Sequence, residues 1–382
     1  MLTSPIGFDS ALDLCVDKAR ANIARLAAVT KTGAFAADGD YFAFDEEFFD
    51  ISNWTSSFFT GMALLAYEKT RDPSLLGACR QLEARYRQKV TVHGMETMHD
   101  LGFLYSLYSV ALYKLTGDPA HRTIGLKAAD ELVKRFIPTG GYIRAWGRMD
   151  EPDTDYAGIA IIDCLMNLPL LFWAAEETGV AHYRYMAVRH ADTVLANFIR
   201  PDAAVFHSFR FDLKTGRPAR PDNYCGYAVD SDWARGSAWA IYGFALAYRC
   251  TRDRRYLDAS RRVAEKFLRA LDAEVVPVWD FRLPAGDPKL RDSSAAAIAA
   301  SGFLELVKHL PGDRELAPAA DRLLARLTSE DYLNPDPACP GLLRFGEVGD
   351  GVGRARTAYT SWGDYFLMET LMKRAGTTIG YW

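Results

Sequence analysis

The sequence predicts an all-α fold, an (α/α)6 toroid of six inner and six outer helices with strand-like rim loops. Segments that are apolar almost all round alternate along the 382 residues with amphipathic segments that have one polar face. The pair recurs at a spacing of roughly 45 to 75 residues, which is typical of a helical array. An open array leaves two apolar ends that need caps, and closure into a ring removes them.

The all-round apolar segments are expected to be inner helices, and the amphipathic segments are expected to pack outside them. The chain opens with an outer helix at 8–28, for which Asp9 is a candidate cap. Further outer helices are expected at 75–89 and in the segments that end near residues 135, 198, 271 and 327. Inner helices are expected at 53–70, 99–116, 158–178, 232–251, 293–310 and 361–374. The first outer helix then pairs with the last inner one and closes the ring.

The composition is that of an ordinary globular protein, with 49% hydrophobic and 25% charged residues. No Pro-, Gly- or Ser-rich linker divides the sequence, so residues 1–382 are expected to form a single (α/α)6-barrel catalytic domain. A formal net charge of -4 provides none of the basic surface that nucleic acid or an anionic membrane requires. We therefore expect neither as a partner.

The six cysteines are expected to be reduced thiols in a cytoplasmic protein. They form no Cys-x-x-Cys pair, and several fall in apolar helical runs. The N-terminal segment lacks a basic stretch followed by a continuous apolar one, and no run reaches the length of a membrane span. The cysteines are Cys15, Cys79, Cys164, Cys225, Cys250 and Cys339.

The loops that precede the inner helices are expected to open on one rim of the ring and to form the active site there. They are 41–52, 93–100, 140–156, 207–231, 279–292 and 334–360. Alternating residues in GYIRAWGR and VFHSFRFD make the third and fourth loops strand-like. The acidic runs DEEFFD and DEPDTD are expected to be solvated, and the glycine-rich GDGVG is expected to be flexible.

Asp163 is the strongest candidate for an active-site acid, because it stands inside the apolar run 158–178. Burial disfavours the charged form of a carboxyl group and raises its pKa toward the range of a general acid. The alternative is that Asp163 satisfies free backbone amides near a helix start. Asp100 occupies the equivalent place one repeat earlier, and two acids facing one rim suggest general acid and base catalysis. Asp232 and Asp364 stand at similar helix starts and are assigned to capping.

Five tryptophans in or beside the rim suit stacking against sugar rings, although packing in the core is the alternative for each. They are Trp54, Trp146, Trp233, Trp239 and Trp362. Arg235 interrupts an apolar inner helix and needs an anionic partner, which is either an internal acid or a ligand carboxylate. His207 lies on a predicted rim strand, where it bonds a ligand, transfers a proton or simply packs.

Residue spacing gives no support for a metal site or a bound cofactor. The seven histidines form no His-Glu-x-x-His motif, and the acidic runs lack the spacing of a calcium loop. GDGVG is not flanked by the strand and helix of a phosphate-binding loop. We therefore expect neither a metal nor a cofactor.

Five motifs, in order along the chain, resemble glycoside hydrolase family 88, the unsaturated glucuronyl hydrolases. They are HDLGF (99–103), IIDCLMNLPLLFWA (161–174), HSFRF (207–211), DSDWARGSAWAIYGFA (230–245) and WGDYFLMETL (362–371). The resemblance implies an (α/α)6 barrel without a metal that releases a 4-deoxy-4,5-unsaturated uronic acid from the non-reducing end of lyase-made oligosaccharides. Such an oligosaccharide is the expected partner, and the protein is expected to be a monomer or a weak homodimer.

The resemblance also implies roles for individual residues. Asp163 protonates C4 of the sugar double bond and then accepts a proton from the water that attacks C5, while Asp100 binds sugar hydroxyls in support. The residues expected around the unsaturated sugar are Trp54, His99, Trp146, His207, Cys225, Arg235 and Trp239. Arg235 and His207 are our candidates for contacts to its carboxylate and ring substituents. Cys225 stands where the family usually has Gln, so a polar contact is lost there and the fine substrate preference is open.

Three other functions fit parts of the sequence. Family 105, the unsaturated rhamnogalacturonyl hydrolases, shares the barrel and the double-bond chemistry but not the motif GSAWAIYG. A sugar epimerase of the N-acylglucosamine type needs histidine acid–base pairs on inner helices, where only His99 is near. A non-catalytic carbohydrate-binding toroid would still bind its ligand after Asp163→Asn, whereas a hydratase would lose its activity.

Overall fold

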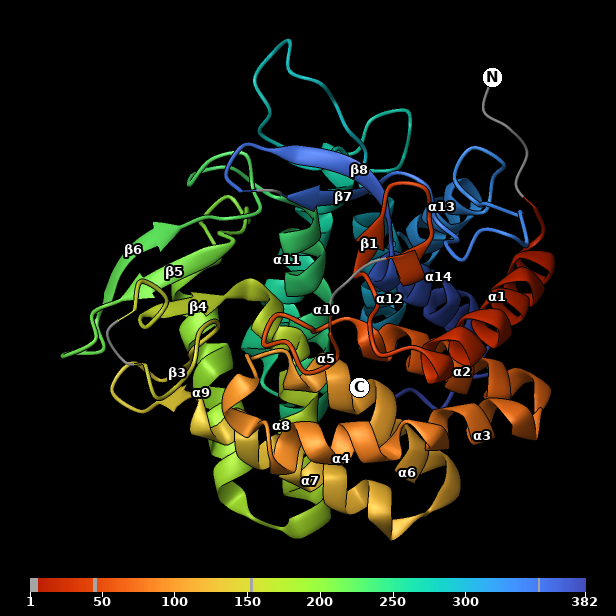
Figure 1. Ribbon diagram of the computed structural model, residues 1–382. Helices are drawn as coiled ribbons and strands as arrows, with labels where there is room; N and C mark the ends of the chain where they lie inside the picture. The colour runs from red at the N-terminus through yellow and green to blue at the C-terminus, as the bar shows by residue number, and fades with distance from the viewer. Residues whose placement is uncertain (1–5, 44–46, 152–153, 350) are drawn as a thin grey trace.

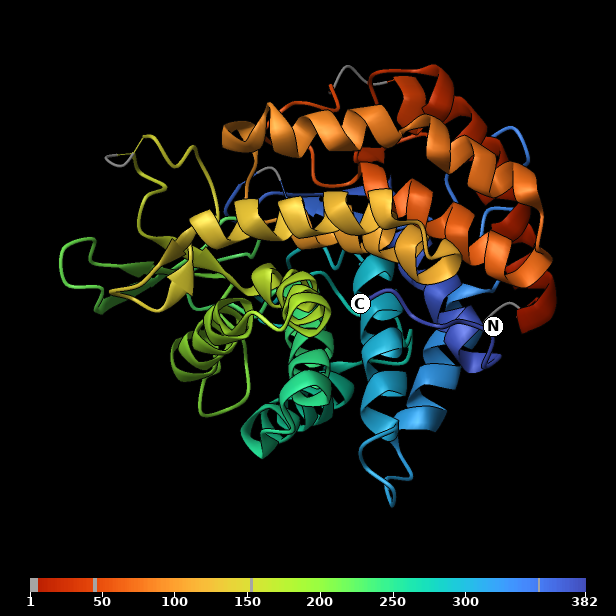
Figure 2. The ribbon, with the colours of Figure 1, turned by 90° about the horizontal axis from the view of Figure 1, so that it is seen from below.

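Six helical segments form a closed inner ring in the computed structural model of the protein, which describes residues 6–43, 47–151, 154–349 and 351–382 (Figures 1 and 2). Each inner segment contacts the next, and α14 returns to contact α2. They are α2 (Ser56–Thr70), α5 (Leu101–Tyr105) continued by η3 (Ser106–Val110) and α6 (Ala111–Thr116), η4 (Ile162–Met166) with α8 (Leu168–Thr178), α10 (Ala234–Thr251), α12 (Ser293–Val307) and α14 (Ser361–Arg374). The predicted (α/α)6 toroid is confirmed.

An outer layer of helices packs against this ring. It consists of α1 (Phe8–Ala28), α3 (Pro73–Gln81), α4 (Glu83–Thr91), α7 (Pro119–Lys134), α9 (Ala181–Asn197), α11 (Arg254–Ala270) and α13 (Leu316–Leu327). The second outer segment, predicted as one helix, divides at Leu82 into α3 and α4. Because α1 contacts both α2 and α14, the first outer helix closes the ring as expected. Within the described ranges, no helix is long and apolar enough to cross a bilayer.

Short turns join inner helices to the outer helices that follow them. Asp72, Asp118 and Asp253 each cap an outer helix by accepting a backbone N–H two residues further on, at 2.9 to 3.0 Å. Proline follows the first two and supplies the φ angle that a first helical turn requires. Asp9 does not act in this way, because the cap position of α1 is Gly7.

Longer loops join outer helices to the next inner ones, and three small antiparallel sheets form within them, in the strand orders β1-β8-β7, β2-β3 and β4-β5-β6. The strands are β1 (Phe35–Ala36), β2 (Phe136–Ile137), β3 (Tyr142–Ile143), β4 (Ile159–Ile161), β5 (Ser208–Phe211), β6 (Pro218–Asp222), β7 (Gly346–Gly349) and β8 (Ala355–Thr360). The strand-like prediction holds in part, since β3 covers two residues of GYIRAWGR and β5 covers four of VFHSFRFD. GDGVG links β7 to β8, but its residue 350 lies outside the described residues, as do 45–46 of DEEFFD and 152–153 of DEPDTD.

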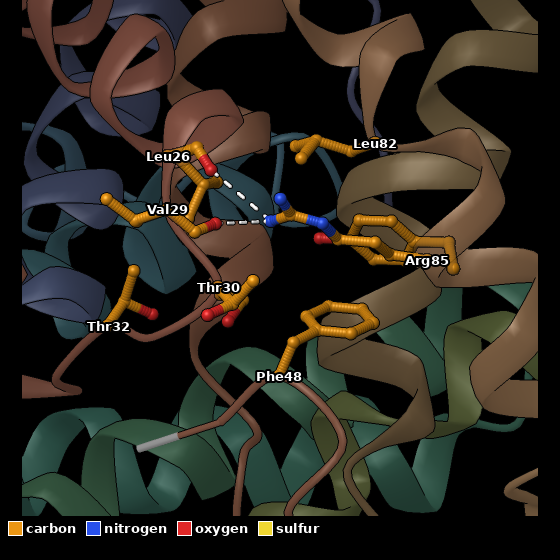
Figure 3. A pocket seen from close by; sticks show the side chains of 9 residues that line it. Leu26, Val29, Thr30, Thr32, Phe48, Leu82 and Arg85 are labelled. Carbon is orange, nitrogen blue, oxygen red and sulfur yellow. Dashed lines mark hydrogen bonds between the residues drawn. The ribbon is translucent and has the colours of Figure 1, made fainter. Parts of the chain in front are cut away.

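The outer helices α1 and α4 are joined through the loop that follows α1. Figure 3 shows the guanidinium of Arg85 donating to the carbonyl oxygens of Leu26 (3.4 Å) and Val29 (2.5 Å), which fixes the end of α1. Phe48 is buried beside Tyr86, with ring centroids 4.9 Å apart. This part of DEEFFD therefore belongs to the core and not to a solvated rim.

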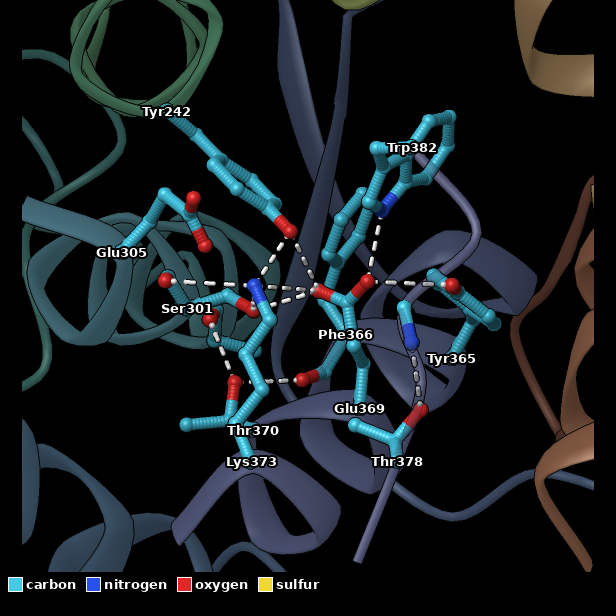
Figure 4. A network of polar contacts seen from close by, with 12 residues as sticks. Tyr242, Ser301, Glu305, Tyr365, Phe366, Glu369, Thr370, Lys373, Thr378 and Trp382 are labelled. Carbon is cyan, nitrogen blue, oxygen red and sulfur yellow. Dashed lines mark hydrogen bonds and ion pairs between the residues drawn. The ribbon is translucent and has the colours of Figure 1, made fainter. Parts of the chain in front are cut away.

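The end of the ring opposite the sheets is closed by residues near the C-terminus. Figure 4 shows the buried carboxylate of Glu369 accepting hydrogen bonds from the hydroxyls of Tyr365 (3.1 Å) and Tyr242 (3.2 Å) and from the indole N–H of Trp382 (2.5 Å). The indole of Trp382 also lies nearly parallel to the ring of Phe366, at 5.9 Å between centroids. These contacts hold the C-terminal residues against the inner helix α14.

A glycine lets two inner segments approach closely beneath that rim. A Cβ atom on Gly102 would lie 2.2 Å from the Cα atom of Asn167, so no other residue fits there without backbone movement. Across the same contact, the N–H of Phe103 donates to Oδ1 of Asn167 at 2.8 Å. The approach holds the start of the Asp100 segment beside the segment that contains Asp163.

Candidate active site

The two candidate acids lie at the amino-terminal ends of neighbouring inner segments. Asp100 directly precedes α5, and Asp163 lies in the first turn of η4, immediately after strand β4. Strand β4 pairs with β5, and the N–H of Ile162 continues the ladder by donating to the carbonyl oxygen of His207 at 3.0 Å. This pairing brings His207 to the same place as the acids.

Asp163 is held as an acid that keeps its proton near neutral pH. Its Oδ1 is buried and has no hydrogen-bond partner in the described part of the chain. Burial raises the pKa of Asp163 to about 7, against the positive charge of Arg235, which lowers it. Helix η4 has no side-chain cap bond, so the capping alternative finds no support.

Asp100 is the second acid of the site. Burial, with the negative charge of Asp163 added to it, raises the pKa of Asp100 to about 8. Nε2 of the adjacent His99 lies 3.4 Å from Oδ1 of Asp100. Burial also lowers the pKa of His99 well below its ordinary value, so this imidazole is neutral. The two carboxyl groups therefore disfavour each other's ionisation, and the site retains protons at neutral pH.

His207 is a neutral hydrogen-bonding group in a fixed orientation. Its Nδ1 accepts the backbone N–H groups of Tyr224 (3.0 Å) and Cys225 (3.4 Å). Burial, reinforced by the charge of Arg235, lowers the pKa of His207 to about 3. Because Nδ1 accepts hydrogen bonds, the ring proton is on Nε2, and this imidazole is a donor there.

Arg235 finds its anionic partners inside the protein. One of its terminal nitrogens donates to Oδ2 of Asp292 (2.5 Å), and to Oε2 (2.9 Å) and the carbonyl oxygen (3.0 Å) of Glu347. The guanidinium also lies over the indole rings of Trp233 and Trp362, at 4.4 and 5.3 Å from their centroids. The internal acid, one of the two alternatives open from the sequence, is therefore present, and a contact of Arg235 with a ligand carboxylate stays a prediction.

A comparison with sequence families identifies the family of this chain. A model of glycosyl hydrolase family 88 matches residues 38–365. The chain belongs to glycosyl hydrolase family 88. It is therefore a glycoside hydrolase.

Several members of family 88 are similar to this chain over nearly its whole length. The unsaturated chondroitin disaccharide hydrolase of Streptococcus pyogenes serotype M1 is 37% identical, with 97% of this chain and 92% of that protein covered. The crystal structure of the unsaturated glucuronyl hydrolase of Bacillus sp. GL1 matches with a TM-score of 0.89 at 33% identity, covering 97% of this chain and 98% of the other. A variant of the unsaturated glucuronyl hydrolase from Streptococcus agalactiae, solved in complex with dGlcA-GalNAc6S, matches with a TM-score of 0.80 at 30% identity. The match covers 100% of this chain and 95% of the other.

The tryptophans expected at the sugar divide in this family 88 enzyme into rim and core residues. Trp54 is partly exposed and stacks on Trp362 with centroids 5.1 Å apart, and Trp146 is also partly exposed. Trp239 is fully buried between Phe103 (5.3 Å) and Phe366 (5.4 Å). The indole N–H of Trp239 has no hydrogen-bond partner among the described residues, and a contact of this ring with the sugar stays a prediction.

Asp232 and Asp364 are not helix caps, contrary to expectation. Asp232 accepts the N–H of Val205 (3.2 Å) and pairs with Lys266. Asp364 accepts the N–H groups of Leu342 (3.0 Å) and Leu343 (2.8 Å), while the cap of α14 is Thr360. Both carboxylates anchor rim loops to the starts of inner helices, because they accept backbone N–H groups from the loops that precede those helices.

Two buried acids that bind Arg235, Asp292 and Glu347, were missed in the sequence. Asp292 precedes α12 and caps it through the N–H groups of Ser294 (3.0 Å) and Ala295 (3.2 Å), so its position at an inner helix start was the available signal. Glu347 lies on β7, and burial raises its pKa to about 7, against the charge of Arg235. Its Oε1 is buried without a hydrogen-bond partner among the described residues. No local pattern marks Glu347, because its partner is 112 residues away.

Cys225 lies beside His207, and its contact with the sugar stays a prediction. Its backbone is bonded to His207, and a Cβ atom on Gly349 of β7 would lie 3.3 Å from its Cα atom. Burial raises the pKa of the thiol, so this cysteine is a small neutral side chain and not a thiolate.

Proposed function

We propose that Asp163 is the general acid and base of this enzyme, which releases 4-deoxy-4,5-unsaturated uronic acid from the non-reducing end of polysaccharide-lyase products. The observation that carries the proposal is the partly buried carboxyl group of Asp163, whose pKa is raised to about 7 and whose buried Oδ1 has no hydrogen-bond partner among the described residues. Protonation of a carbon atom needs an acid that still carries its proton at the working pH. An ordinary exposed aspartate, with a pKa near 3.9, does not meet that requirement.

The reaction that fits this site is the hydration of a vinyl ether. Asp163 gives its proton to C4, and the positive charge that develops at C5 is shared with the ring oxygen. Water then adds to C5, and the carboxylate of Asp163 takes the proton that the water loses. The resulting hemiketal opens, and the glycosidic bond breaks with release of the second sugar. One acid therefore acts twice, and it ends the cycle in the form in which it began.

The neighbouring residues support this role by binding and by charge. Asp100 raises the proton affinity of the site and accepts hydrogen bonds from sugar hydroxyls. His207 presents a neutral N–H group, and Arg235 supplies a positive charge that offsets the uronate carboxylate even though Asp292 and Glu347 hold its nitrogen. Trp54, His99, Trp146 and Cys225 complete the surroundings of the unsaturated sugar in this proposal.

Incubation with unsaturated disaccharides tests the function. Products of chondroitin, hyaluronan, heparin, gellan and ulvan lyases should be supplied in turn, and loss of the ultraviolet absorbance of the double bond followed. We place the chondroitin disaccharide first, because the relative from Streptococcus pyogenes carries that name. Absence of any loss with the whole panel would refute the proposal.

Replacement of Asp163 by Asn tests its role against that of another buried aspartate. Asp163→Asn should lower kcat by roughly 10²- to 10⁴-fold, because the amide cannot donate the proton, while the thermal midpoint stays near that of the wild type. Asp364→Asn is the matched control. It weakens the acceptor of two backbone amides, so it should lower stability by about 1 to 3 kcal/mol with a much smaller effect on kcat.

We also propose that residues 1–382 act as one catalytic domain, in the cytoplasm, as a monomer or weak homodimer that uses no cofactor. One continuous cluster of buried apolar residues from α1 to α14 supports the first point. The six cysteines are all free thiols, which agrees with a reducing compartment. Sedimentation at several protein concentrations tests the oligomeric state.

A further inference from the structure

Three aromatic side chains at the rim form one surface, in which a partly exposed tryptophan contacts two exposed tyrosines; together, Trp146, Tyr156 and Tyr224 are called the aromatic wall below. The ring of Trp146 meets those of Tyr156 and Tyr224 edge-on, with centroids 5.8 and 5.6 Å apart. Tyr156 is 49% exposed and Tyr224 48%, although most of the aromatic side chains in the described part of the chain are buried. Apolar faces left in water next to hydroxyl groups are typical of a surface that binds an amphipathic ligand.

The aromatic wall is fixed in place by buried polar groups behind it. Arg144 is 2% exposed, and its guanidinium donates to the carbonyl oxygens of Trp146 (2.9 Å) and Glu151 (3.3 Å) and to Oγ1 of Thr154 (3.1 Å). These contacts brace the loop that carries Tyr156. Tyr224 is held separately, because its backbone N–H donates to the buried His207. A braced surface loses little conformational freedom when a ligand binds.

The aromatic wall is continuous with the acid site. The carbonyl oxygen of Ala145, next to Trp146, accepts the N–H of His99 at 3.1 Å, and His99 precedes Asp100. The N–H of Ala145 donates to Ile159 at 2.9 Å, and Ile159 begins the strand that leads to Asp163. The ring of Trp146 lies 6.3 Å from that of His207. The aromatic wall therefore begins at the two acids and extends from them toward solvent.

The chemistry of the wall selects among the parts of a substrate. The unsaturated uronic acid carries a carboxylate, and its double bond must reach Asp163. The second sugar is joined at C1 and extends away from the acids. A pyranose ring has one face of C–H groups and hydroxyls around its edge, which matches the flat, uncharged faces and phenol groups of the wall.

We propose that the aromatic wall binds the second sugar, the ring on the leaving side of the scissile bond, by stacking Tyr156 and Tyr224 against its C–H face. This inference rests on the proposed function and adds a subsite to it. The wall thereby selects for disaccharides over unsaturated uronic acids that carry a small leaving group.

The test compares two substrates that differ only in the leaving group. These are an unsaturated chondroitin disaccharide and the methyl glycoside of the same unsaturated uronic acid. Tyr156→Ala and Tyr224→Ala should each lower kcat/KM for the disaccharide about three- to tenfold, mainly by raising KM. The kcat/KM for the methyl glycoside should stay at the wild-type value. Tyr156→Phe and Tyr224→Phe should retain most of the wild-type value, because the ring remains.

Tyr185→Ala is the matched control, since Tyr185 is 58% exposed on the outer helix α9, where its ring meets that of Phe136. This variant should have the wild-type kcat/KM for both substrates. Equal losses on both substrates in the wall variants, or no loss on either, would overturn the inference.

If the wild-type enzyme consumes neither substrate, the proposed function is contradicted. A binding measurement then decides whether the aromatic wall binds the second sugar. Calorimetry with the intact disaccharide gives the dissociation constant for the wild type and the two alanine variants. Weaker binding by the variants supports the subsite, and unchanged or undetectable binding in all three proteins contradicts it.

Discussion

Asp163 must be protonated at the start of each catalytic cycle, and its pKa of about 7 sets the pH at which that holds. Above this pH the acid form disappears, so kcat/KM should fall about tenfold for each further pH unit. Burial raises this pKa from its ordinary value. For an exposed aspartate, the fall in kcat/KM, which is the alkaline limb of the pH profile, would begin near pH 4. Initial rates from about pH 5 to about pH 9 measure the limb, and a profile that stays flat to the upper end would contradict the assignment.

Glu347 should influence the alkaline limb of the pH profile of kcat/KM, through its contact with Arg235. Once ionised, Glu347 partly cancels the positive charge of Arg235, which lowers the pKa of Asp163. Glu347→Gln removes this negative charge, so the pKa of Asp163 should fall and the alkaline limb should move to lower pH. The pH profile of kcat/KM for the variant gives the shift, with the thermal midpoint as a check on folding. A limb that moves to higher pH would show that Glu347 does not act by this route.

At the scale of elements, the contact between the α5 and η4 segments depends on Gly102. In Gly102→Ala the new Cβ would meet the backbone of Asn167 at 2.2 Å, so the segments must separate and the two acids with them. We expect a loss of about 2 kcal/mol or more in the free energy of unfolding, together with lower kcat.

Gly77→Ala is the control for Gly102→Ala. Gly77 lies inside the outer helix α3, and a Cβ atom added there would have no other atom within 4 Å. Alanine should stabilise that helix by about 0.5 to 1 kcal/mol and leave activity unchanged. Chemical denaturation of both variants measures the difference. Equal effects of the two substitutions would contradict the importance of the close approach.

The helices could be predicted from the sequence because the patterns that define them are local. Inner helices are apolar all round and outer helices carry one polar face, and each pattern repeats within a single segment. Asp163 and Asp100 stood out for the same reason, as acids at equivalent places in two apolar segments. The sequence did not indicate how deeply each side chain of an inner helix lies below the rim, and the full burial of Trp239 follows only from the packing of Phe103 and Phe366 around it.

The acids that hold Arg235 could not be predicted, because the contact is made only by folding. Asp292 and Glu347 are 57 and 112 residues from Arg235, on a helix start and a rim strand. No periodicity links such positions. The need for an anionic partner was evident from the sequence, but its identity depended on how the ring closes.

At the scale of the whole molecule, Trp382 holds the end of the ring that lies opposite the acids. Trp382→Ala removes a buried ring and one of the donors to Glu369, so it should cost about 3 to 5 kcal/mol of stability. The ring of Phe103 contacts both Trp382 (5.9 Å) and Trp54 at the site (5.4 Å), so Trp382 acts on the site indirectly, through Phe103, and kcat at low temperature should stay within about twofold of the wild type. Ile379→Ala, at a 59% exposed position nearby, should change stability by less than about 0.5 kcal/mol. Thermal unfolding compares the two variants, and a large kcat loss in Trp382→Ala would show that the two ends are coupled.

The common direction of the inner helices has an electrostatic consequence. Each peptide unit carries a dipole, and an α-helix sums these to roughly half a positive charge at its amino-terminal end. The first turns of α2 and α10 contain no acidic residue, whereas Asp163 lies in the first turn of the third inner segment and Asp292 caps α12. The amino-terminal ends of α2 and α10 therefore add positive potential at a rim that also carries carboxyl groups, and an anionic uronate gains from these two ends on a chain whose formal net charge is -4.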